Sequence, residues 1–113
     1  MKIISKKFPS NQLKIMAKKS FGDLVKAVVD VEKKVIAIDG ELHADEEALL
    51  LEKGSKQENL WGINLYPEIN SYDWIEFDSM INLRPLSGNR SRGVDNVKLK
   101  KKIIAIVNQL IEK

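Results

Sequence analysis

The most restrictive feature of the sequence is a pair of short β-branched runs, residues 25–31 and 35–38, separated only by Glu32-Lys33-Lys34. Valine and isoleucine favour extended backbone, and the three polar residues between the runs suit a tight turn. The two runs therefore predict a β-hairpin, which commits this part of the chain to antiparallel pairing. Asp39-Gly40 follows the second run and is a typical turn dipeptide.

Strand-like and helix-like segments alternate on both sides of the hairpin. Apolar residues at helical spacing predict three helices, which begin near residues 10, 44 and 96. Strand patterns occur at residues 3–4, 61–66 and 74–84. The predicted order is β-α-β-β-α-β-β-α. Strand pairs between helices predict an α+β fold with a largely antiparallel sheet of four to five strands and the helices packed on one face.

The composition is that of one ordinary globular domain, and we assign residues 1–113 to it. Hydrophobic residues make up 43% of the chain and charged residues 31%, and a chain of this size can bury a core of its own. The sequence has no cysteine, which excludes disulfides and thiolate metal sites. No segment has the length of a signal peptide core or a membrane span. We therefore expect a cytoplasmic protein that does not interact with membranes.

The net charge of +3 conceals a strong division along the chain. Residues 1–40 carry a net +5, residues 41–80 a net −8, and residues 81–113 a net +6. One interpretation is that acidic and basic elements neighbour each other in the fold. The other is that the two basic ends assemble a surface that binds an anion, such as nucleic acid or a phosphate-bearing ligand.

Residues 74–84 alternate strictly and predict a two-faced strand, with Glu76 and Asp78 on its polar face. A loop rich in Gly, Ser, Asn and Arg follows. Arginine binds carboxylates and phosphates in a fork-like geometry, and such a loop before a helix can cradle an anion. The predicted ligand-binding residues are Asn82, Arg84, Asn89, Arg90 and Arg92. The alternative is an ordinary solvated sheet face followed by a polar loop.

A second candidate site precedes the acidic helix. His43 is the only histidine, and with Glu41 and the more distant Asp78 it forms a weak set of catalytic candidates for acid–base work. The alternative is that these residues serve only the entry into the helix, whose first-turn acids already suit the helix dipole. One histidine among carboxylates is a poor metal signature, and we predict no metal site.

Four segments together resemble a known family: residues 40–45, 54–64, 77–85 and 88–92. Their sequences are GELHAD, GSKQENLWGIN, FDSMINLRP and GNRSR. They are similar to a small prokaryotic family of domains of unknown function, and the similarity covers nearly the whole chain, most clearly from residue 21 onward. The resemblance implies a stand-alone domain. It implies no activity, because the family has none that is established.

Three functions stay open at this point. The favoured one is a module that binds an anionic ligand through the arginine-rich loop. The first alternative is a small hydrolase or nuclease that uses His43 and Asp78 with the arginines, so the sequence does not decide whether the protein is an enzyme. The second alternative is a protein-interaction module, including a homo-oligomer. No P-loop, dinucleotide fingerprint or zinc-protease motif is present, and the sequence does not indicate whether a cofactor is bound.

Overall fold

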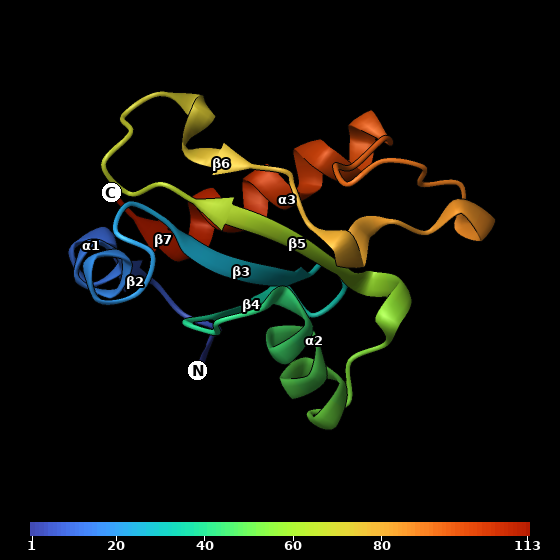
Figure 1. The fold of residues 1–113 in the computed structure, drawn as a ribbon, viewed down its shortest axis with the longest axis horizontal. Helices are drawn as coiled ribbons and strands as arrows, with labels where there is room; N and C mark the ends of the chain where they lie inside the picture. The colour runs from blue at the N-terminus through green and yellow to red at the C-terminus, as the bar shows by residue number, and fades with distance from the viewer.

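A five-stranded antiparallel sheet forms the centre of the protein in the computed structural model, which describes residues 1–113 (Figure 1). Every neighbouring pair of strands in it runs antiparallel. The strands, in their order across the sheet, are β1 (Lys2–Ile4), β4 (Val35–Ile38), β3 (Val25–Asp30), β5 (Leu60–Leu65) and β6 (Ile75–Glu76). The predicted α+β class and antiparallel sheet are confirmed.

The central hairpin of β3 and β4 is the one that the β-branched runs predict. Its turn is fixed by Asp30, whose Oδ1 accepts hydrogen bonds from the backbone N–H groups of Glu32 and Lys33, both at 2.9 Å. Asp30 is buried, and its Oδ2 accepts a third hydrogen bond from the Ser55 hydroxyl at 2.6 Å. The carboxylate therefore ties the turn to the chain that leads into β5.

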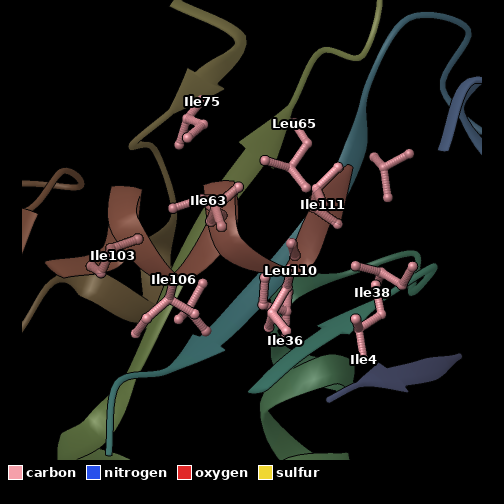
Figure 2. Close-up of a cluster of buried hydrophobic side chains, with 14 of the residues drawn as sticks. Ile4, Ile36, Ile38, Ile63, Leu65, Ile75, Ile103, Ile106, Leu110 and Ile111 are labelled. Carbon is pink, nitrogen blue, oxygen red and sulfur yellow. The ribbon is translucent and has the colours of Figure 1, made fainter. Parts of the chain in front are cut away.

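Three helices cover the sheet, and none of them is long and apolar enough to cross a membrane. Helices α1 (Ser10–Lys19) and α3 (Val97–Leu110) pack on one face over the main core, which contains 21 buried residues. Figure 2 shows how residues of α3 such as Ile103 and Ile106 approach Ile63 of β5 within this core. A parallel pair of short strands, β2 (Phe8–Pro9) and β7 (Ile111–Glu112), joins the two ends of the chain.

The prediction that all helices lie on one face is wrong for α2 (His43–Glu52). This helix packs on the opposite face, where Leu50 contacts a small cluster with Val28, Ala37 and Leu60 (Figure 1). The reason is that β4 is apolar on both of its alternating faces, and that Val28 of β3 and Ala37 of β4 lie on the face away from the main core. Both faces of these strands therefore need cover.

The predicted two-faced strand over residues 74–84 is also not formed. Only Ile75–Glu76 is a strand, and Met80–Asn82 forms a 3₁₀ turn. The reason is Asn82, which is fully buried and whose side chain takes the place of a neighbouring strand. Its Oδ1 accepts from the Gly62 N–H at 2.8 Å, and its Nδ2 donates to the Gly62 carbonyl at 2.9 Å. A side-chain amide thus completes the backbone pairing of β5 where β6 has ended.

Candidate functional site

A polar cavity of about 430 Å³ lies beside the N-terminus of α2 and the edge formed by β6. It is on the α2 side of the sheet, because its strand residues alternate with those that face the main core. Residues from β3, α2, β5, β6 and the loop before α3 contribute to it. The lining residues are Phe21, Leu24, Lys26, His43, Asn64, Tyr66, Glu76, Asp78 and Arg92.

His43 is the first residue of α2, and its imidazole ring is fixed by a backbone carbonyl. Its Nε2 lies 2.8 Å from the carbonyl oxygen of Ile63. A carbonyl oxygen only accepts hydrogen bonds, so Nε2 carries the proton and Nδ1 holds the free lone pair of the neutral ring. Burial lowers the pKa of His43 below its usual value, so the ring is neutral near pH 7. His43 is therefore an oriented base.

Asn64 of β5 links the base to the acidic side of the cavity. Its Nδ2 donates to Glu76 Oε1 at 2.9 Å and to the Asp78 carbonyl at 3.3 Å. The Tyr66 hydroxyl donates to the same Glu76 oxygen at 3.1 Å. Burial, and then the Glu76 carboxylate, raises the pKa of Tyr66. The Asn64 side chain is only 7% exposed, yet its Oδ1 has no hydrogen-bond partner.

Two cations complete the cavity. Arg92 Nε donates to Asp78 Oδ1 at 2.6 Å, and the terminal guanidinium nitrogens of Arg92 make no hydrogen bond within the chain. Lys26 lies with its Nζ 4.8 Å from the centre of the Phe21 ring and has no carboxylate within ion-pair distance. The cavity thus combines two cations, two carboxylates and a neutral imidazole.

Of the residues singled out in the sequence, His43, Asp78 and Arg92 meet in this cavity. His43 is on α2, whereas Asp78 and Arg92 lie in the segment between β6 and α3. Glu41 is exposed and does not line the cavity. Arg90 is exposed as well, and its side chain makes no hydrogen bond or ion pair. Two of the three catalytic candidates, His43 and Asp78, therefore share one cavity with a single predicted ligand-binding arginine, Arg92.

Arg84 has contacts that hold it within the fold. Its Nε donates to the Ile81 carbonyl at 3.1 Å, and an Nη donates to the Leu60 carbonyl. The guanidinium stacks 4.5 Å from the centre of the Trp61 ring, and its ion pair with Glu47 is 3.9 Å long. Burial lowers the pKa of Arg84, although Glu47 opposes this. Arg84 does not line the cavity that contains Arg92.

The side chains of Asn82 and Asn89 are likewise used by the protein itself. Asn89 is 6% exposed and donates to the carbonyls of Asn82, Ser91 and Gly93. Its Oδ1 accepts from the Asp95 N–H at 2.8 Å. The loop before α3 is therefore closed around Asn89, and its predicted role as an open cradle has no support in these contacts.

The sequence placed Glu76 on a polar strand face, but no ligand-binding or catalytic role was predicted for Lys26, Asn64, Tyr66 or Glu76. Asn64 and Tyr66 alternate with the core residues of β5, and this polar alternation is the signal that could have identified them. Lys26 gives a weaker signal, since it is a single cation in an apolar strand. The chain contains no group of three or more His, Cys, Asp or Glu residues placed to hold a metal ion.

Fold and site together define an α+β domain with a polar, mixed-charge cavity on the less covered face of its sheet. Residues 2–110 match the model of the family described as "Protein of unknown function (DUF5674)", and the chain belongs to this family. The family resemblance of the four sequence segments is thereby confirmed. Searches among curated proteins and solved structures found no match.

Proposed function

We propose that the cavity around His43 binds a small phosphate-bearing ligand. The observation that supports this is the meeting of two cations, Lys26 and Arg92, with an oriented imidazole in one cavity. The terminal nitrogens of Arg92 suit two phosphate oxygens at once, and Lys26 adds a point charge. Arg92 is thus the member of the arginine-rich loop that takes part.

The cavity also offers acceptors for hydrogen-bond donors of the ligand. These are the Glu76 and Asp78 carboxylates and His43 Nδ1, whereas Asn64 Oδ1 is buried within the protein. A sugar phosphate or nucleotide carries hydroxyl donors beside its phosphate, and it matches both halves of the cavity.

The two carboxylates offset the two cations, so we expect weak binding of inorganic phosphate, on the order of 1 mM. The test is a titration of the ¹⁵N-labelled protein with inorganic phosphate and with ribose 5-phosphate, followed by amide chemical shifts. Shifts at Lys26, His43 and Asn64 are expected, with tighter binding of the sugar phosphate.

Two substitutions distinguish ligand binding in this cavity from binding elsewhere in the arginine-rich loop. R92A is expected to weaken binding about tenfold or more, because it removes a charge-assisted contact of about 1.5–3 kcal/mol. R90A removes the same side chain two positions away and leaves binding unchanged. Equal losses in both variants, or shifts confined to the loop around Arg90, would contradict the assignment.

A second candidate function is catalysis of acid–base chemistry on that ligand. The observation that favours it is the hydrogen bond from His43 Nε2 to Ile63, which presents Nδ1 as a base. Asp78 then orients Arg92 and is not the acid itself.

A further inference from the structure

The cavity contains a base but no free hydroxyl or thiol that could act as a nucleophile. Its lining includes no Ser, Thr or Cys side chain. The one hydroxyl present, on Tyr66, donates to Glu76, and its pKa is raised. A tyrosine in this state is a poor nucleophile. Asn64 and Tyr66 engage the Glu76 carboxylate, and Arg92 engages that of Asp78. The attacking hydroxyl is therefore assigned to the ligand or to water.

The charge balance of the cavity favours one kind of phosphate group over another. Lys26 and Arg92 face Glu76 and Asp78, and the neutral His43 adds no charge. A phosphodiester carries one negative charge, whereas a phosphate monoester carries nearly two. A cavity with no net charge suits the diester better, because the carboxylates repel each added negative charge.

The side chain next to His43 is suited to its protonated form. Asn64 interacts with the imidazole in a way that favours protonation, and Asn64 Oδ1 is a buried acceptor without a partner. When Nδ1 takes a proton, the ring becomes a donor at that nitrogen. Burial outweighs this contact and lowers the pKa of His43, so the ring is neutral at rest and readily gives up a proton that it has taken.

From these contacts we propose that the cavity cleaves RNA by attack of a ribose 2′-hydroxyl on the adjacent phosphodiester, with His43 as the base and Arg92 and Lys26 as the groups that stabilise the phosphate. This proposal rests on the proposed phosphate-binding function. The 2′-hydroxyl is the free hydroxyl that the cavity itself lacks, and it is also a donor for the acceptors of the cavity.

The step is balanced without a co-reactant. His43 Nδ1 takes the proton of the 2′-hydroxyl, and the 2′-oxygen forms a bond to phosphorus. The bond from phosphorus to the 5′-oxygen of the next nucleotide breaks, and that oxygen leaves with the electron pair. It takes a proton from solvent, and His43 returns its own proton to solvent. The products are a 2′,3′-cyclic phosphate and a 5′-hydroxyl, and nothing is oxidised or reduced.

The test uses a 5′-fluorescein-labelled unstructured RNA oligonucleotide and its fully 2′-O-methylated counterpart. The protein is expected to cleave the RNA to cyclic-phosphate ends and to leave the methylated strand intact. H43Q keeps a donor for Ile63 but removes the base, so its rate should fall about 10²–10⁴-fold. R92A should lose about 10²-fold through weaker charge stabilisation, while R90A keeps the unmodified rate.

The rate should rise with pH as His43 loses its proton, with a midpoint below the usual imidazole value of 6.5. Cleavage of the methylated strand, or an H43Q rate equal to that of the unmodified protein, would overturn the proposal. The methylated strand tests the unmodified protein, so it decides the matter even where H43Q fails to fold. If inorganic phosphate shifts the amide signals of the cavity but RNA is not cleaved, the catalytic proposal is overturned and the phosphate site is not. Absence of both would overturn the phosphate site as well.

Discussion

Glu46 shows at the level of one residue how strongly α2 is adapted to its place against the sheet. Its side chain is fully buried, and Oε2 accepts a hydrogen bond from the Gly40 N–H at 2.9 Å. Oε1 has no partner. Burial raises the pKa of Glu46 to about 9, although the Gly40 hydrogen bond opposes this. The carboxyl is therefore protonated in the folded protein at neutral pH.

This protonation makes stability depend on pH. The folded protein holds the Glu46 proton up to about pH 9, whereas the unfolded chain loses it near the usual value of 4.5. The stabilisation is fully present below pH 4.5 and is lost as pH rises toward 9, by up to about 1.4 kcal/mol per unit. E46Q keeps the acceptor for Gly40 and should remove the slope.

Urea unfolding between pH 7 and pH 9 checks this, because His43 no longer titrates in that window. E46Q is expected to be more stable than the unmodified protein at pH 8. E46D, which keeps the titrating group, should retain a slope. A slope of equal size in E46Q and in the unmodified protein would show that Glu46 is already ionised.

At the level of elements, Asn82 decides where β6 ends and where the cavity begins. Its amide bonds to both backbone groups of Gly62, and it also donates to the Arg92 carbonyl at 2.9 Å. N82D would lose both donated hydrogen bonds and bury a charge. We expect a loss of about 3 kcal/mol or more in the free energy of unfolding.

Chemical denaturation of N82D and of the matched variant N70D measures this cost. Asn70 is exposed, so the same change of amide to carboxylate there should alter stability by no more than about 0.5 kcal/mol. A small effect of N82D would mean that the end of β6 does not depend on the amide.

A comparison of the β3–β4 hairpin with residues 74–84 shows why the sequence predicts some parts of the fold and not others. The hairpin of β3 and β4 is predictable because its pattern and its turn are local to the chain. Residues 74–84 alternate as a strand would, but their conformation depends on Gly62, about 20 positions away. A Cβ on Gly62 would lie 2.5 Å from that of Ser79, so the two segments approach more closely than any side chain on Gly62 allows.

The grouping of residues in the candidate cavity could be predicted only in part. His43, Asp78 and Arg92 could each be selected for their chemistry, but only the order of strands in the sheet brings them together. Arg84 has the same chemistry as Arg92, but it stacks on the Trp61 ring and does not line the cavity. Residue type indicates candidates, whereas packing between distant segments decides which of them share a cavity.

For the whole molecule, the unequal cores on the two faces of the sheet separate the larger core from the face that carries the candidate site. The main core holds 21 buried residues, whereas α2 is held on the other face through a cluster of four. Segments with few buried apolar contacts open at lower free energy than the global transition. Helix α2 carries His43, so the base belongs to the less firmly held part of the protein.

Native-state hydrogen exchange tests this division. The amides of α2 should exchange through openings of lower free energy than those of β3 and β5. L50A removes the only buried α2 side chain of the small cluster, at a cost of about 2–5 kcal/mol. It should speed exchange in α2 most, whereas I103A in the main core should speed exchange in the sheet and α3 as well. Equal protection of α2 and β3 would show instead that both faces open together, and His43 would then be held as firmly as the core.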